Sequence, residues 1–183
     1  MDAHEPRIPP SPFVRQYCNN SFPQFPRLKK DFFGMDVKVK DWISYQQGQY
    51  KGALAYLDHS LGRFFTLLKE RGIYDSALIV VTSDHGELFR LSPQLLLGHS
   101  QQMYQGAVKV PLMIKYPYNQ RVGRYPGKIT LADLFSTILS ICDFPIAQNI
   151  SGNSFGTDLP VVSELYSEKL VSIMPFMMES TSI

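Results

Sequence analysis

A short apolar run at residues 77–83, Ala-Leu-Ile-Val-Val-Thr-Ser, constrains the fold more than any other feature of this sequence. Its β-branched composition is typical of a strand buried on both faces, as in a parallel sheet. A helical pattern precedes it over residues 45–71, and Gly72 follows that pattern as a left-handed helix terminator. The apolar positions of this helix recur every three or four residues: Leu54, Leu57, Leu61, Phe64 and Leu68.

Two further elements follow the apolar run. Residues 108–116 predict a second strand, in which Pro111 indicates an edge or a bulge. Thr130 and Asp133 form a Thr-x-x-Asp capping box at the start of a helix over residues 131–142. Helix, buried strand, loop, strand and helix in this order predict an α/β fold, with a mainly parallel sheet flanked by helices.

Composition excludes several classes of function. A chain of 183 residues with 44% hydrophobic and 19% charged residues can bury a core. Its net charge of +2 gives no support for binding nucleic acid, and no apolar run is long enough to span a membrane. The only cysteines, Cys18 and Cys142, exclude a disulfide framework. We see no secretory signal pattern, so the sequence alone indicates no compartment.

Asp84 and His85 follow directly from the apolar run, within Thr-Ser-Asp-His-Gly-Glu. Ligands of open α/β sheets collect at the carboxyl ends of strands, so a site is expected here. A carboxylate and an imidazole are ordinary ligands for a divalent cation. Gly86 lets the chain turn away without obstructing the site. The alternative is a plain strand-end turn, in which Asp84 caps the next element and His85 is solvated.

Two more histidines are candidates for the same site. His99 precedes the second strand, where it could bind an anionic oxygen or protonate a leaving group. His4 lies in Asp-Ala-His-Glu-Pro-Arg, where prolines stiffen the loop, although chain ends are usually mobile. A loop histidine with a local hydrogen bond is the simpler interpretation of His99. We interpret His59 as a helix-surface residue, and Cys18 has no companion histidine that would make it a nucleophile.

Taken in order, these segments resemble the C-terminal part of the catalytic domain of the sulfatase family, in the alkaline phosphatase superfamily. The resemblance covers roughly residues 1–145 and includes the segments around His4, Asp58, Asp84, His99 and Asp133. It implies a partial alkaline-phosphatase-like α/β fold. Its parts would be an irregular loop segment at 1–44, an α/β core at 45–145 and the start of a C-terminal region at 146–183.

The resemblance also implies roles for four residues. Asp84 and His85 would bind a divalent cation, with Ca²⁺ as the first candidate and Mg²⁺, Mn²⁺ or Zn²⁺ as alternatives. His4 and His99 would contact the sulfate or phosphate group of an ester substrate, and His99 would act as a catalytic residue on the leaving-group oxygen. Family members usually act in periplasmic, secreted or lumenal compartments.

The Asp-His-Gly-Glu motif leaves the substrate class open. Sulfatases share it with phosphodiesterases, phosphonate hydrolases, and phosphoethanolamine or phosphoglycerol transferases. Sulfatases convert a cysteine to formylglycine within Cys-x-Pro/Ser/Ala-x-Arg, whereas Cys18 is followed by Asn-Asn-Ser-Phe. The first pair of acidic ligands is missing too. We therefore expect a fragment with half of a metal site, inactive without a missing N-terminal half that carries the formylglycine. A non-catalytic truncated product is the remaining alternative.

Overall fold

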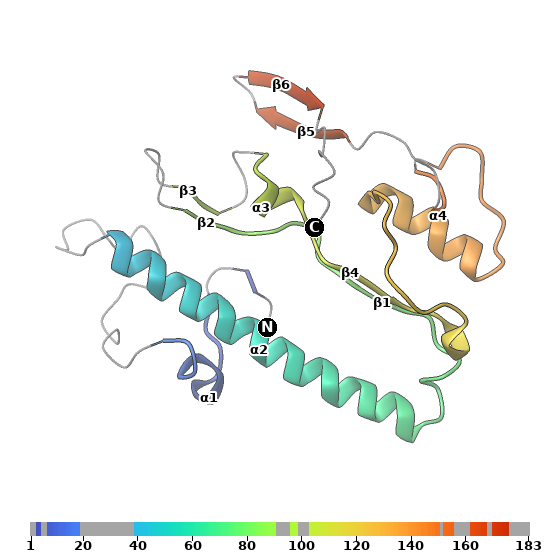
Figure 1. The fold of residues 1–183 in the computed structure, drawn as a ribbon, viewed down its shortest axis with the longest axis horizontal. Coiled ribbons are helices and arrows are strands. Elements are labelled where there is room, and N and C mark those ends of the chain that lie inside the picture. The colour runs from blue at the N-terminus through green and yellow to red at the C-terminus, as the bar shows by residue number, and fades with distance from the viewer. Residues whose placement is uncertain are drawn as a thin grey trace. The chain divides into compact units, whose positions relative to one another are not determined.

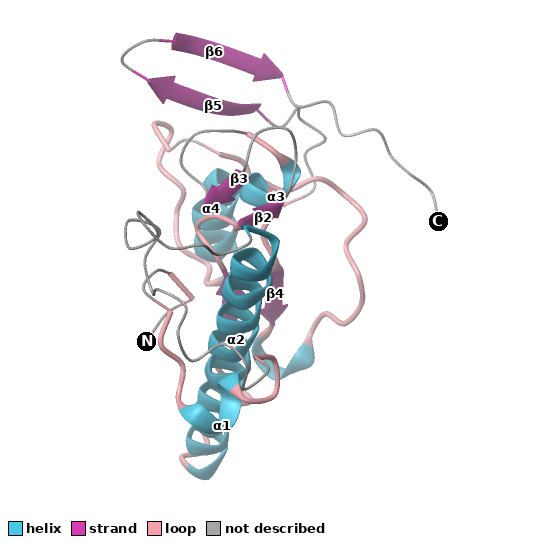
Figure 2. Ribbon diagram, turned by 90° about the vertical axis from the view of Figure 1, so that its left-hand side faces the viewer, coloured by secondary structure: helices cyan, strands magenta, loops and turns pink. Residues whose placement is uncertain are grey.

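A computed structural model of the chain is drawn in Figures 1 and 2. The residues that the structure describes are 3–4, 7–18, 39–90, 96–98, 103–150, 152–155, 162–167 and 170–175. They belong to two units that interleave along the sequence. The first unit lies within residues 1–79, 88–98 and 115–120, the second within 80–87, 99–114 and 121–183, and each is considered by itself.

A helix of 32 residues, α2 (Val39–Glu70), is the main element of the first unit. It begins at residue 39 rather than at the predicted residue 45, and Asp41 in its first turn complements the helix dipole. It ends as predicted, where Gly72 adopts a left-handed conformation with a φ of 67°. No helix in the described ranges, α2 included, is long and apolar enough to cross a lipid bilayer.

The short helix α1 (Ser11–Val14) lies against α2, as Figure 2 shows. The two backbones approach closely because Gly52 has no side chain, and a Cβ there would lie 2.9 Å from the Cα of Val14. The rings of Phe13 and Tyr56 meet edge to face with centroids 5.2 Å apart. A helical turn this short is not stable alone, so α2 provides the surface that stabilises it.

One apolar face of α2 is exposed among the described residues. Four of its side chains are 39–49% exposed, and we call them the exposed stripe: Leu54, Leu57, Phe64 and Leu67. The Leu and Phe repeat thus predicts the helix correctly but not its burial. The hydrophobic side chains of α2 that are buried are instead Trp42, Ile43 and Ala53, which are 3%, 5% and 5% exposed.

Within the described residues, six strands pair in the orders β1–β4, β2–β3 and β5–β6 (Figure 1). The strands are β1 (Ile79–Thr82), β2 (Leu88–Arg90), β3 (Leu96–Gly98), β4 (Leu112–Lys115), β5 (Val162–Ser167) and β6 (Leu170–Pro175). The β2–β3 and β5–β6 pairs are antiparallel, with Phe89 opposite Leu97 and Leu165 opposite Ser172.

β1 and β4 are the two strands that the sequence predicts, although each is only four residues long. The hydroxyl of Thr82, at the end of β1, donates to the carbonyl of Pro111, just before β4, at 2.8 Å. The N–H of Tyr118, beyond β4, donates to the carbonyl of Asp75, ahead of β1, at 2.6 Å. This order of contacts is that of an antiparallel pair. β1 is only partly buried, and Thr82 at its end is exposed, so the prediction of a strand buried on both faces is wrong for β1 in this chain. The mainly parallel order of the sheet stays a prediction.

The helix α4 (Leu131–Ile141) matches the predicted helix, including its capping box. The hydroxyl of Thr130 accepts the N–H of Asp133 at 3.2 Å, and Asp133 Oδ2 accepts the N–H of Thr130 at 2.9 Å. The other carboxylate oxygen accepts the N–H of Asn153 at 2.9 Å and fastens that segment to the start of the helix. The apolar neighbours of Cys142 in the sequence predict a core position for it. This prediction is wrong, because Cys142 is exposed at the C-cap.

Asp133 makes the stability of α4 depend on pH. Burial raises the pKa of its carboxyl group, but hydrogen bonds from Asn153 and Thr130 outweigh burial and lower the pKa below its usual value. The stabilisation is therefore complete above the unfolded-state pKa of about 3.9 and is lost as the pH falls through the folded-state value. We expect Asp133→Asn to cost about 1 kcal/mol near neutral pH and almost nothing near pH 2.

Melting followed by circular dichroism at the two pH values measures this difference. Asp143→Asn is the control, because it removes the same charge from an exposed residue beyond the other end of α4. An Asp133→Asn effect of equal size at both pH values would contradict the role of the carboxylate.

Candidate metal centre

Local hydrogen bonds set the conformation of the loop that follows β1. Oδ1 of Asp84 accepts the backbone N–H of His85 at 2.9 Å, and the Ser83 hydroxyl donates to the His85 carbonyl at 2.6 Å. Nδ1 of the imidazole donates to the Gly86 carbonyl at 2.9 Å. Short polar side chains that bond to nearby backbone compete with strand pairing, so β1 ends at Thr82.

The two candidate ligand atoms of this loop lie close together. Nε2 of His85 is 3.8 Å from Oδ2 of Asp84, and the two side chains are 37% and 87% exposed. Because a carbonyl oxygen only accepts, the contact with Gly86 places a hydrogen on Nδ1. Nε2 of the neutral ring then offers a lone pair. Histidines that bind metals commonly have such a carbonyl partner on the other nitrogen.

A divalent cation fits this spacing. Two ligands that each lie about 2.3–2.6 Å from a shared Ca²⁺ ion are roughly 3.3–4.2 Å apart at angles of about 90–110°. The observed 3.8 Å lies within that range. Carboxylate oxygen suits Ca²⁺, Mg²⁺ and Mn²⁺, and imidazole nitrogen suits Zn²⁺. In the described part of the chain, no three His, Cys, Asp or Glu residues cluster, so this pair would hold an ion only together with further ligands.

Asp84 carries a charge at neutral pH. The hydrogen bond from the His85 N–H lowers the pKa of this carboxyl group below its usual value, against the opposing effect of desolvation. The His85 ring and the Ser83 hydroxyl lower the pKa further. A carboxylate must be ionised to bind a metal, and Asp84 has this form at neutral pH.

The helix α3 (Gln105–Val108) fixes the turn that follows His85. The N–H of Gly86 donates to the carbonyl of Ala107, a buried residue, at 2.6 Å. A Cβ on Gly86 would lie 2.0 Å from the carbonyl oxygen of Gly106, far inside van der Waals contact. From the sequence alone, Gly86 is explained only by the turn of the chain. The close approach of the two backbones requires glycine more strongly than the turn does.

The other predicted site residues are placed differently. His4 is exposed and belongs to the first unit, whereas Asp84 and His85 belong to the second, so their convergence on one substrate stays a prediction. His99 lies outside the described residues. Of the predicted site residues, the structure thus brings Asp84 and His85 together.

Sequence reasoning missed Arg7, three residues after His4. Its side chain is only 6% exposed, and its Nε donates to the carbonyl of Ala3 at 2.9 Å. In the sequence, an arginine among prolines looks like an ordinary loop charge. Only its burial marks it as part of the structure around His4.

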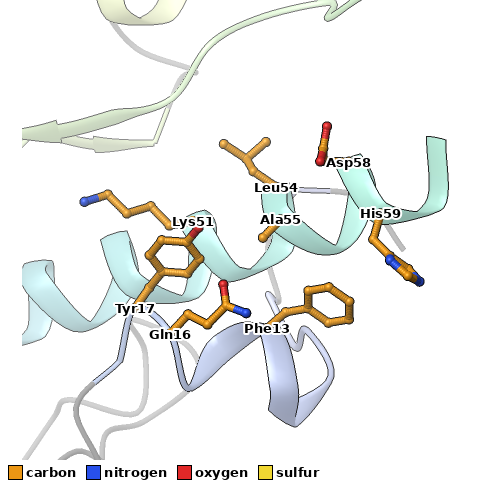
Figure 3. A pocket seen from close by; sticks show the side chains of 8 residues that line it. All are labelled: Phe13, Gln16, Tyr17, Lys51, Leu54, Ala55, Asp58 and His59. Atoms are coloured by element: carbon orange, nitrogen blue, oxygen red, sulfur yellow. The ribbon is translucent and has the colours of Figure 1, made fainter. Parts of the chain in front are cut away.

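A shallow concavity of about 590 Å³ lies between α1 and α2 (Figure 3). Its lining residues are Phe13, Gln16, Tyr17, Lys51, Leu54, Ala55, Asp58 and His59. Asp58 and His59 form a second Asp-His dipeptide, but Figure 3 shows their side chains pointing away from each other. His59 is exposed, as its helix-surface interpretation predicts.

The sequence profile of the sulfatase family matches residues 4–144. The chain therefore belongs to the sulfatase family, in the alkaline phosphatase superfamily. Arylsulfatase K from Bos taurus is 32% identical over 120 residues, which cover 66% of this chain and 21% of that protein. Phosphonate monoester hydrolase SpPMH from Silicibacter pomeroyi aligns with a TM-score of 0.59 and 25% identity, over 87% of this chain and 34% of that one.

The solved structures confirm the predicted α/β, alkaline-phosphatase-like fold. A putative sulfatase from Bacteroides fragilis aligns over 88% of this chain with a TM-score of 0.63 and 19% identity. At that identity the likeness concerns the fold alone. The chain spans about a fifth of the length of the bovine relative and about a third of the solved structures that it matches.

Gly86→Ala tests the close contact between α3 and the loop that follows β1, residues 83–87. The added methyl group forces the two backbones apart, so we expect a loss of about 1–3 kcal/mol in the free energy of unfolding. Gly62→Ala is the matched control, because a Cβ at that position of α2 meets nothing within 4 Å. It should raise helix stability by about 0.5–1 kcal/mol. Urea unfolding measures both, and a Gly86→Ala variant as stable as the wild type would contradict the contact.

Proposed function

We propose that this chain carries the metal-binding pair and the anion-binding histidines of a metal-dependent sulfuric-ester hydrolase. One observation supports the proposal most. Inside the sulfatase match at residues 4–144, Asp84 and His85 follow β1 with their candidate ligand atoms 3.8 Å apart. A hydrogen bond from the His85 N–H lowers the pKa of the Asp84 carboxyl group, and Nδ1 of the imidazole bonds to the Gly86 carbonyl.

The four residues would divide the work as follows. Asp84 and His85 hold a divalent cation, with Ca²⁺ as the first candidate, which when bound polarises an ester oxygen and offsets negative charge in the transition state. His4 and His99 bind the sulfuryl oxygens through charge-assisted hydrogen bonds. His99 also gives a proton to the leaving-group oxygen.

The nucleophile of this reaction would come from outside the 183 residues. No Cys-x-Pro/Ser/Ala-x-Arg segment occurs among them. Burial raises the pKa of the Cys18 thiol, which disfavours the reactive thiolate. We therefore propose that a further polypeptide part supplies the formylglycine and the remaining acidic ligands.

A phosphorus-directed hydrolase is the second candidate. It is favoured by the likeness to a phosphonate monoester hydrolase at 25% identity and a TM-score of 0.59. The retained motif is common to both classes, so the nucleophile segment decides between them. Translating the DNA upstream of the Met1 codon tests this: Cys-x-Pro-x-Arg supports the sulfatase, and a Ser or Thr nucleophile supports the phosphorus enzyme.

Metal binding is the direct test of the Asp84–His85 pair. We expect calorimetric titration with Ca²⁺, Mn²⁺ and Zn²⁺ to detect binding of at least one ion to the full chain. Asp84→Asn and His85→Gln should each weaken this binding at least about tenfold, because each removes one ligand of the ion.

The second Asp-His dipeptide provides a matched control. Asp58→Asn combined with His59→Gln makes the same chemical changes on α2, where the side chains point apart. This double variant should bind the metal like the wild type. Equal metal affinity in all variants, or no binding by the wild type, would refute the metal role and favour a non-catalytic product.

The chain alone should not turn over sulfate esters. Loss of a nucleophile typically lowers rates by several orders of magnitude, so we expect no hydrolysis of 4-nitrophenyl sulfate or of a phenylphosphonate monoester above the buffer rate. Release of nitrophenol or phenol is measured with and without metal. Turnover that disappears in Cys18→Ser would show that the nucleophile assignment is wrong.

A further inference from the structure

Arg7 is a charged side chain that the first unit buries. It is 6% exposed, and its guanidinium group contacts two aromatic rings. Its Cζ lies 5.5 Å from the ring centroid of Tyr50 on α2 and 5.2 Å from that of Phe89 on β2. The two rings are themselves 5.2 Å apart. Cation–π contacts of this kind strengthen when the cation is removed from water.

Directed hydrogen bonds complete the surroundings of the guanidinium group. Nε donates to the carbonyl of Ala3 at 2.9 Å, and Nη1 donates to Oε1 of Gln46 at 3.4 Å. Gln46 lies on α2 and is 3% exposed. The Ala3 carbonyl belongs to the peptide bond that leads into His4. Because the guanidinium nitrogens form a rigid planar fork, the aromatic contacts also determine the direction of the bond to Ala3.

The elements around Arg7 are joined to one another. Gln47 on α2 donates through Nε2 to the Phe89 carbonyl on β2 at 3.4 Å. Pro9 is buried against α2, and a Cβ on Gly52 would lie 3.1 Å from its Cγ. His4, by contrast, is exposed. An exposed imidazole thus follows a backbone group that is tied to two elements of the first unit.

We propose that Arg7 is a positioning residue for His4. It fixes the Ala3–His4 peptide on α2 and β2, so that the imidazole meets the anionic group of the substrate in one orientation. This inference rests on the proposed function, in which His4 binds the sulfuryl oxygens. Orientation before binding raises affinity because less freedom is lost when the anion arrives. Arg7 itself does not reach the anion, because its guanidinium group is buried by Tyr50 and Phe89.

Histidine side-chain NMR of the full chain tests the proposal with inorganic sulfate as the probe. Sulfate is titrated at constant ionic strength, and His4→Gln identifies the His4 signals. Arg7→Met should weaken sulfate binding at His4 about tenfold, as removal of a supporting partner does at metal sites. Arg7→Lys should weaken it similarly, because an ammonium group keeps the charge but not the fork.

Arg15→Met is the matched control. It removes the same charge from an exposed arginine at the C-cap of α1. It should leave the sulfate affinity of His4 at the wild-type value. Equal weakening by Arg15→Met and Arg7→Met would mean that net charge causes the effect, and the positioning role would be overturned.

The outcomes separate this inference from the proposed function. A wild-type His4 that responds to sulfate, with an equal response in Arg7→Met, overturns the positioning role and leaves the anion-binding role intact. A wild-type His4 that ignores sulfate refutes the anion-binding role, and the inference with it. Metal binding by Asp84 and His85 is measured independently of both.

A second variant keeps the test valid if Arg7→Met unfolds the first unit, which circular dichroism will reveal. Phe89→Leu removes one ring and leaves the guanidinium group in place. It should weaken sulfate binding about two- to threefold. It should also lower the heteronuclear NOE of the His4 amide, which reports backbone motion on the ps–ns timescale. Wild-type affinity together with a wild-type NOE in this variant would overturn the proposal.

Discussion

The contact between α3 and the loop that follows β1 determines where the candidate ligands lie. Gly86 approaches the backbone of residues 106 and 107 so closely that no side chain fits, and its N–H bonds to the Ala107 carbonyl. The Gly86 carbonyl accepts a hydrogen bond from Nδ1 of the His85 ring. One glycine therefore joins the loop to its support and also orients an imidazole. Asp84, two residues before Gly86, accepts the N–H of His85, and this hydrogen bond is the main cause that lowers the pKa of its carboxyl group.

The same arrangement occurs around His4, although its parts are different. In both places the candidate ligand reaches solvent, partly at His85 and more fully at His4, while a neighbouring backbone group is held by a buried residue. At His85 the support is the α3 backbone, and at His4 it is the guanidinium group of Arg7. An accessible ligand with a buried support suits the binding of small ions, because the ligand atom contacts solvent while the protein interior determines its position.

Local signals allowed much of the fold to be predicted from the sequence. Thr130 and Asp133 are sufficient to start α4, since both partners of the capping box lie within one turn. The sequence pattern predicts the start of α2 too late, because the burial of Trp42 and Ile43 by tertiary packing cannot be seen from helix propensity. The strand expected at 108–116 is shortened because residues 105–108 form α3. The burial of Arg7 and the contact of Gly86 both need partners far along the chain, so neither was foreseeable. The role of His99 stays a prediction.

The exposed stripe on α2 has a consequence for the thermodynamics of unfolding. Heat-capacity change and urea sensitivity both grow with the apolar area that becomes hydrated when a protein unfolds. Leu54, Leu57, Phe64 and Leu67 are already 39–49% exposed in the folded chain, so unfolding of α2 hydrates only the remaining part of their area. The length of α2, 32 residues, would by itself predict a steep unfolding transition. Because this side of the helix is already partly hydrated, we expect the unfolding transition to be broader than the length of the helix predicts.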